Sequence, residues 1–169
     1  NGLNDWSNVT TPTQLSLPSG VLIDFSIAVN HACGIFEDSG TRKLYCWGSN
    51  YAGEISSSSL GNDGFISTLV LTSSTLEKVE LGELSGNYDN GRTCVIDNGA
   101  LKCRGANSYG QSDPSNVGVN VDSSLFTLWS SGVTKAGARN GFVTCALVND
   151  DVRCTGLSDS GILGASIAN

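Results

Sequence analysis

The sequence predicts an all-β fold in which four-stranded antiparallel sheets repeat along one domain, residues 1–169. Three observations predict it: six cysteines pair at hairpin spacing, a glycine-led turn follows each pair, and short alternating apolar runs precede each pair. Each pair brackets one hairpin, so the cysteines set the register of the central strands. The predicted pairs are Cys33/Cys46, Cys94/Cys103 and Cys145/Cys154.

The second cysteine pair shows the hairpin geometry most clearly. Asn98-Gly99 lies midway between Cys94 and Cys103, and both residues suit the positive φ angles of a two-residue type I′ turn. Counting outward from this turn places the cysteines opposite each other at a non-hydrogen-bonded position, where facing side chains come closest. A disulfide can therefore join the two strands without backbone movement.

The other two cysteine pairs follow the same count. The third hairpin has Asn149-Asp150 as its turn, whereas the first has a longer tip, from Glu37 to Arg42. Since residues two apart share a face of a strand, each cystine shares a predicted core face with one apolar pair. These pairs are Ile35/Leu44, Ile96/Leu101 and Leu147/Val152. Closing a loop of about ten residues contributes about 2.5 to 3 kcal/mol in the chain-entropy description.

Composition places the chain among globular proteins and excludes several functions. Hydrophobic residues make up 39% and charged residues 15%, and no apolar run reaches the length of a membrane span. The net charge of −7 and the pI near 4.4 disfavour a nucleic-acid partner, because a phosphate backbone requires clustered cations.

The cysteines favour an oxidising compartment over metal binding. The alternative is zinc, but cysteines nine or thirteen residues apart across hairpins lack the close pairs that present two thiolates to one ion. Asn8 begins the glycosylation sequon Asn8-Val9-Thr10, which fits a secreted chain. We therefore expect an extracellular or cell-surface location.

A glycine-led turn recurs after each cysteine pair with a period of about fifty residues. The copies are Trp47–Gly53, Arg104–Gly110 and Thr155–Gly161, and a fourth, degraded copy is Gly2–Ser7. The approximate repeats are 1–54, 55–111 and 112–169.

Two further strands are predicted before each hairpin, from alternating apolar residues bounded by Pro, Gly and Ser. The first strand contains, in successive repeats, Leu15/Leu17, Leu69/Leu71 and Val117/Val119/Val121. The second contains Phe25/Ile27/Val29, Val79/Leu81 and Val133–Ala136. Each repeat is thus predicted to be a four-stranded sheet without a long helix, and repeated sheets of this kind are typical of a β-propeller.

The repeat resembles that of the regulator of chromosome condensation family, in the cysteine-paired style of secreted proteins. The segments that carry the resemblance are Val29–Gly53, Thr93–Gln111 and Thr144–Gly164. The resemblance implies a β-propeller. It leaves the function open, because propellers of this kind serve as exchange factors, enzyme inhibitors and adhesive modules.

The family closes about seven blades into a ring, whereas this chain holds about three blade-lengths. We therefore expect a partial propeller that is either cut from a longer protein or completed by head-to-tail association with copies or with another subunit. Uncovered sheet edges would otherwise favour aggregation.

No catalytic, cofactor or metal site is predicted, so the chain is expected not to be an enzyme. His31 is the only histidine, and Arg92 and Val143 occupy the equivalent places in the other repeats. No imidazole base therefore recurs, and His31 is expected to pack and to form hydrogen bonds. Acids at the spacing of a calcium loop and glycine-rich phosphate loops are also missing from the sequence.

Aromatic residues are the remaining candidates for binding. Tyr51 and Tyr109 lie in glycine turns and Trp129 lies in a connection between strands, where large amphipathic rings anchor proteins or stack on sugars. Trp129 is alternatively part of a satellite core. Trp47 takes the family's usual tryptophan place, which implies packing between blades.

The sequence therefore predicts a non-enzymatic extracellular module for binding, adhesion or assembly, which presents its propeller loops to a protein or glycan partner. Two alternatives stay open: a protein inhibitor of a secreted enzyme, and a structural subunit of a surface filament or virus particle. No cofactor is expected, and self-association or membership of a longer chain is expected.

Overall fold

The structure is a computed structural model that describes residues 10–57, 64–84, 87–138 and 141–163. Across these residues it contains eleven strands and one short 3-10 turn, Asp159–Gly161, so the predicted all-β class is confirmed. None of the described helical structure has the length and hydropathy needed to span a bilayer. The sequon at Asn8 lies outside the described residues.

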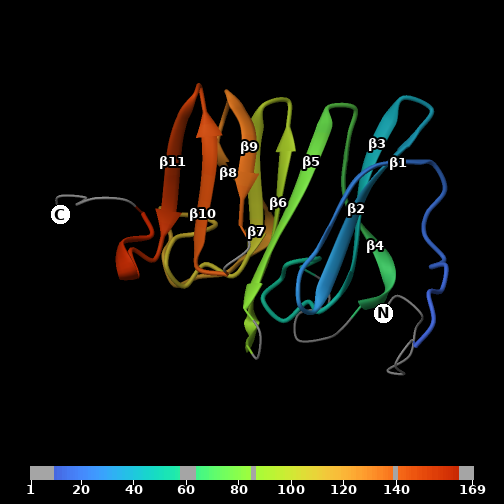
Figure 1. Cartoon of the computed structure of the whole chain (residues 1–169), viewed down its shortest axis with the longest axis horizontal. Helices are drawn as coiled ribbons and strands as arrows, with labels where there is room; N and C mark the ends of the chain where they lie inside the picture. Colours follow the sequence, from blue (N-terminus) through green and yellow to red (C-terminus); the bar gives the residue numbers. More distant parts are fainter. Residues whose placement is uncertain (1–9, 58–63, 85–86, 139–140, 164–169) are drawn as a thin grey trace.

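The strands form three antiparallel sheets that stand side by side as successive blades of a partial β-propeller (Figure 1). The first sheet has the order β1 (Val21–Ile27), β2 (His31–Asp38), β3 (Thr41–Gly48) and β4 (Gly64–Ser73). The second has the order β5 (Leu76–Leu84), β6 (Asn87–Asp97), β7 (Ala100–Gly105) and β8 (Val121–Trp129). The third, as far as it is described, has the order β11 (Asp151–Gly156), β10 (Val143–Val148) and β9 (Val133–Gly137).

Each central hairpin carries one disulfide between directly opposed cysteines, as its register predicts. The disulfides are Cys33–Cys46, Cys94–Cys103 and Cys145–Cys154. The predicted turns Asn98-Gly99 and Asn149-Asp150 have positive φ at both positions. This is the backbone conformation that a type I′ turn requires.

The longer tip predicted for the first hairpin, from Glu37 to Arg42, is wrong. The two strands stay paired up to Ser39-Gly40, which forms a two-residue turn with φ of 53° and 76°. Arg42 Nε lies 2.7 Å from Glu37 Oε2 across the strands. This cross-strand ion pair allows two charged residues to extend the ladder, which the search for apolar alternation did not anticipate.

The outer strands β4 and β8 pair back with the hairpin that precedes them in the sequence. β4 pairs with β3, and β8 pairs with β7. The predicted strand at Leu69/Leu71 therefore exists as β4, and it completes the sheet of the preceding hairpin. Each four-stranded sheet thus combines strands from both sides of a glycine turn.

Two of the predicted strands are misplaced. Leu15 and Leu17 lie outside any strand, where a hydrogen bond from Leu17 N–H to Leu15 O (3.1 Å) closes a local turn before Pro18. Val117 and Val119 lie in the loop that precedes β8. In both segments, local turn formation replaces the strand pairing that alternation suggested.

The apolar core lies between neighbouring sheets, in two clusters. The first joins sheets one and two through Cys33, Ile35, Leu44, Cys46, Ile55, Leu76, Val79, Leu81 and Val95. The second joins sheets two and three through Cys94, Ile96, Leu101, Cys103, Val133, Ala138, Ala146 and Val148. Two of the predicted inner faces are therefore buried as expected.

The third predicted core face is wrong. Val152 is 74% exposed, and Leu147 and the third cystine are half-buried. The cystine face of each of the first two sheets is covered by the next sheet, and no described sheet covers the third. The alternation of apolar residues correctly identified which residues share the cystine face. Whether that face is buried depends on a neighbouring sheet that covers it.

Candidate functional site

Three glycine-led turns leave the sheets at the end opposite to the hairpin tips (Figure 1). They begin at Gly48, Gly105 and Gly156, whose φ angles are 104°, 104° and 120°. A Cβ at any of the three would collide with a backbone carbonyl oxygen in, or just before, the adjacent strand. Glycine is required at each place by this close approach and by the positive φ, so the sequence repeat is a repeat of backbone structure.

One buried asparagine organises each of the first two turns. Asn50 Oδ1 accepts hydrogen bonds from the N–H groups of Ile55 (2.8 Å) and Ser56 (3.0 Å). Asn107 Oδ1 accepts from the N–H groups of Ser112 (3.0 Å) and Asp113 (2.8 Å) in the same way. These bonds satisfy the backbone of an irregular segment and fix its shape.

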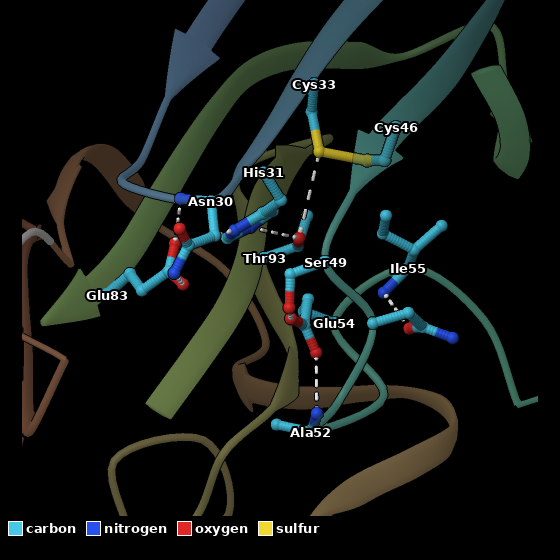
Figure 2. A network of polar contacts seen from close by, with 11 residues as sticks. Asn30, His31, Cys33, Cys46, Ser49, Ala52, Glu54, Ile55, Glu83 and Thr93 are labelled. Atoms are coloured by element: carbon cyan, nitrogen blue, oxygen red, sulfur yellow. Dashed lines mark hydrogen bonds and ion pairs between the residues drawn. A yellow bond between two sulfur atoms is a disulfide. The ribbon is translucent and has the colours of Figure 1, made fainter. Parts of the chain in front are cut away.

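Six residues after the leading glycine of each of the first two turns stands a fully buried polar side chain, Glu54 or Gln111. Glu54 accepts hydrogen bonds from the Ser49 hydroxyl (2.9 Å) and from Ala52 N–H (2.8 Å), as Figure 2 shows. Gln111 accepts from Tyr109 N–H (2.8 Å), and its Nε2 donates to the carbonyl of Gly141 (3.2 Å) in the third sheet's segment. Glu54 thus braces its own turn, whereas Gln111 attaches the second turn to the segment that leads into β10.

In the second and third hairpins, the residue after the second cysteine reaches back to the preceding turn. Arg104 Nε donates to the carbonyl of Gly53 (2.6 Å). Thr155 Oγ1 donates to the carbonyl of Gly110 (3.0 Å), the equivalent glycine of the second turn. Trp47 has the same place in the first sheet, on the face that points away from the second sheet.

His31 connects the first sheet to the second. Its Nδ1 lies 3.3 Å from Glu83 Oε2, and its Nε2 lies 3.3 Å from Thr93 Oγ1 (Figure 2). Asn30 donates to both Glu83 oxygens, through its backbone N–H and its Nδ2, each at 2.7 Å. We refer to this contact between sheets one and two as the first interface. Hydroxyl, imidazole and carboxylate stand in line, and Thr93, His31 and Glu83 are all buried.

The Glu83 carboxyl has a lowered pKa. Burial raises the pKa, but the hydrogen bonds from His31 and Asn30 together outweigh this effect and leave it below the ordinary 4.5. Glu83 is therefore a carboxylate in the folded protein near neutral pH.

Arg92 has the place of His31 in the second repeat and connects the second sheet to the third. Its Nη1 donates to the carbonyl of Gly141 (2.6 Å), and its Nη2 donates to Ala138 O (2.7 Å) and to Val143 O. Burial lowers its pKa to about 9, which still leaves it protonated near neutral pH. We refer to this contact as the second interface.

The structure brings two of the predicted binding residues to one end of the molecule and separates the third from them. Tyr51 and Tyr109 lie in the first and second turns and are 43% and 42% exposed. The Tyr109 ring contacts Phe142 edge to face, with centroids 5.2 Å apart. Trp129 lies near the hairpin-tip end, opposite Leu101, and packs against the second core cluster.

No group of three or more potential metal ligands gathers anywhere in the described ranges. The zinc alternative is wrong for the cysteines, because all six are joined in disulfides. A thiolate is needed to bind zinc, and a disulfide sulfur does not provide one.

The residues that join the sheets were not predicted from the sequence. Glu54 and Gln111 share a spacing from the leading glycine, and Arg104 and Thr155 share a spacing from a cysteine. These equal spacings are visible in the sequence. They did not reveal a shared role, because the residue type differs between repeats even where the backbone acceptor is equivalent, as for Arg104 and Thr155.

Comparisons with known proteins support the fold. No protein-family model matches the chain, and no curated protein matches it. Among solved structures, the crystal structure of human WBSCR16, an RCC1-like protein, superposes with a TM-score of 0.65 at 18% identity over 85% of this chain and 35% of that chain. The chain thus spans about a third of the length of that protein. At this identity the likeness shows the fold alone.

The chain therefore has an RCC1-like β-propeller fold, of which the described residues form three disulfide-braced sheets. Three intrachain disulfides indicate an oxidising compartment, consistent with an extracellular location.

Proposed function

We propose that the protein is a non-enzymatic extracellular binding module that presents its glycine turns to a partner. The partner that we propose is another protein. The observation that carries the proposal is the placement of Tyr51 and Tyr109. Each is more than a third exposed, and each lies on a turn whose backbone is fixed by a buried asparagine. Both turns leave the sheets at the same end of the molecule (Figure 1).

Rigid turns that carry tyrosines suit recognition for energetic reasons. A tyrosine ring offers a large contact area and a polar hydroxyl, and few of its torsions are ordered on binding. A turn already held by hydrogen bonds adds little further ordering cost. With a net charge of −7, the chain favours a partner whose surface is basic.

We propose a non-enzymatic role because His31, the candidate general base, has a structural role. His31, the chain's only histidine, is buried between Glu83 and Thr93 and serves the contact between sheets. A general base must reach the proton that it removes, and the His31 side chain is fully buried against Glu83.

The experiment compares the intact protein with the double variant Tyr51→Ser/Tyr109→Ser against panels of secreted proteins and of glycans. We expect the intact protein to bind at least one member of the panels and the double variant not to bind it. Val152→Ser is the control, because Val152 is 74% exposed on β11 and lies away from the first two turns. Binding that survives loss of both tyrosines would contradict the proposed surface. A response only on the glycan panel would replace the protein partner by a carbohydrate.

A further inference from the structure

A cavity of about 290 Å³ lies where edge strands of the three sheets come together. The strands are β1, β5 and β9, and β5 lies between the other two (Figure 1). Consecutive residues of each strand line the cavity, 24–26, 78–80 and 134–136, together with Ile96 of β6. The cavity is thus formed by strands of all three sheets, and its lining does not include the glycine turns.

Between the first and second sheets, a carboxylate covers the edge of β5. Facing pairs in antiparallel strands alternate between hydrogen-bonded and non-hydrogen-bonded pairs. Val79 faces Val95 in a pair of the second kind, because its N–H points away from β6 and donates to Asp24 Oδ2 (2.8 Å). Lys78 Nζ lies 3.7 Å from Asp24 Oδ1. One carboxylate therefore meets a backbone N–H and an ammonium group at this edge.

The edge of β9 presents an equivalent backbone N–H to the cavity. Ala136 faces Ala146, the residue after the first cysteine of its hairpin, just as Val79 faces Val95 in the second sheet. The Ala136 N–H therefore points away from β10, toward the edge of the sheet. Since β9 is the edge strand and Ala136 lines the cavity, this N–H is available to an acceptor there.

Between the second and third sheets, a lysine takes the place of the carboxylate. Asp24 faces Ile35 and Lys78 faces Ile96, in each case two residues after the first cysteine of the hairpin. Both Asp24 and Lys78 also lie directly after a break in strand register. The backbone N–H is thus repeated, but the residue that would cover it carries an ammonium group. This combination favours a carboxylate that comes from outside the chain.

The charged side chains that line the cavity restrict what else the ligand carries. Asp24 and Glu80 supply two negative charges, and Lys78 and Lys135 supply two positive charges, so the lining is neutral as a whole. A ligand with only a carboxylate adds a negative charge beside Glu80. A ligand that also carries an ammonium group adds no net charge and complements both signs.

We propose that this cavity binds a small zwitterion with a carboxylate and an ammonium group, namely a free α-amino acid. Its carboxylate accepts a hydrogen bond from the Ala136 N–H and pairs with Lys78. Its ammonium group pairs with Glu80, and its apolar part lies on Ile96. The inference does not depend on the proposed function, which concerns the glycine turns.

The first experiment titrates the intact protein with each standard L-amino acid at millimolar concentrations in a calorimeter. We expect at least one amino acid to bind. Two analogues of it, one without the ammonium group and one without the carboxylate, should bind about tenfold more weakly or worse, because each lacks one charge-assisted contact. The proposal is overturned if no amino acid binds, or if either analogue binds as tightly as the amino acid.

Two substitutions of Lys78 test the site. Lys78→Gln removes the ammonium group, and Lys78→Asp supplies the chain's own carboxylate to the Ala136 N–H, as Asp24 does for Val79. Each should weaken binding about tenfold or more. The Lys78 side chain is 58% exposed, so folding stays intact, which circular dichroism checks.

The matched control is Arg153→Gln, because the Arg153 side chain is 52% exposed and does not line the cavity. It should bind like the intact protein. Unchanged affinity in either Lys78 variant would overturn the proposal.

Chemical-shift mapping by nuclear magnetic resonance separates this cavity from the surface of the proposed function. On addition of the amino acid, the Ala136 amide should shift among the most, whereas the Val119 amide, in the loop before β8, should not shift. The largest shifts at Tyr51 and Tyr109 would instead place the amino acid at the glycine turns and would overturn the inference.

Discussion

The two interfaces between sheets have the same backbone geometry and different chemistry. At the first, His31 meets the side-chain carboxylate of Glu83. At the second, Arg92 occupies the same repeat position and meets only backbone carbonyls. Carbonyl oxygens are placed by the fold and do not titrate, whereas a carboxylate is a separate side chain that protonates in acid. The residue at this repeat position, His31 or Arg92, therefore determines how the interface responds to acid. The glycine turns and the cystine faces determine how the sheets pack.

The largest expected effect is the loss of Arg92. Arg92→Ala leaves three buried carbonyls without their donor and opens a cavity at the second interface, and we expect it to lower the free energy of unfolding by about 3 to 5 kcal/mol. Urea denaturation followed by circular dichroism measures this difference. Arg92→Lys should recover little, because one ammonium does not reproduce the planar guanidinium that reaches Gly141, Ala138 and Val143.

Arg153→Ala is the control for charge removal, since Arg153 is half exposed and lies 4.0 Å from Asp151. Exposed ion pairs of this kind contribute about 0 to 1 kcal/mol. If Arg92→Ala unfolded at the same urea concentration as Arg153→Ala, the second interface would not depend on the buried guanidinium.

The sequence predicts the hairpins well because their determinants are local. The Asn98-Gly99 turn fixes the register of the two strands that it joins. Cys94 and Cys103 are equally far from this turn, so they lie opposite each other. The first hairpin is the exception, because its Ser39-Gly40 turn is flanked by charged residues and lacks the apolar alternation that predicts a strand.

The contacts between sheets could not be predicted because their partners are distant and chemically varied. Glu83 lies 52 residues from His31, and the acceptors of Arg92 are backbone atoms that leave no mark in the sequence. Burial of Val152 was predicted wrongly for the same reason, since alternation gives the face of a strand but not what covers it.

The second prediction compares two disulfides of equal loop length at different depths. Cys94–Cys103 and Cys145–Cys154 both span nine residues, so loop closure contributes the same about 2.5 to 3 kcal/mol to each. The Cys94–Cys103 disulfide is fully buried in the second core cluster, whereas Cys145–Cys154 is half-buried. Replacing the buried pair by alanines should therefore cost about 1 kcal/mol more, because a cavity remains in the core.

Chemical denaturation of the two double-alanine variants under identical conditions measures this difference. The control for residual disulfide exchange is a thiol titration of each variant, which should show no free cysteine. Equal losses of unfolding free energy would mean that the cystine face of the second sheet is no better packed than that of the third.

The smallest effect is expected at Glu83, and it depends on pH. Glu83→Gln keeps the shape of the first interface but removes its carboxylate, which accepts charge-assisted bonds, and should cost about 1 to 2 kcal/mol near neutral pH. Because the folded pKa lies below the ordinary 4.5, the unfolded chain binds this proton more readily than the folded protein does. The stability contributed by the carboxylate is thus present above pH 4.5 and is lost as the pH falls through the lower folded value.

The difference in unfolding free energy between the intact protein and Glu83→Gln should accordingly shrink as the pH falls below 4.5. Denaturant titrations at a series of pH values measure it, and Glu77→Gln, at an exposed glutamate with one hydrogen bond to Gly99 N–H (3.1 Å), is the matched control. Arg92→Ala should lose the same free energy across this acid range, because its carbonyl partners do not titrate. A gap between Glu83→Gln and the intact protein that stayed constant in acid would show that both interfaces are held by neutral packing, and the chemical difference between them would then have no consequence for stability.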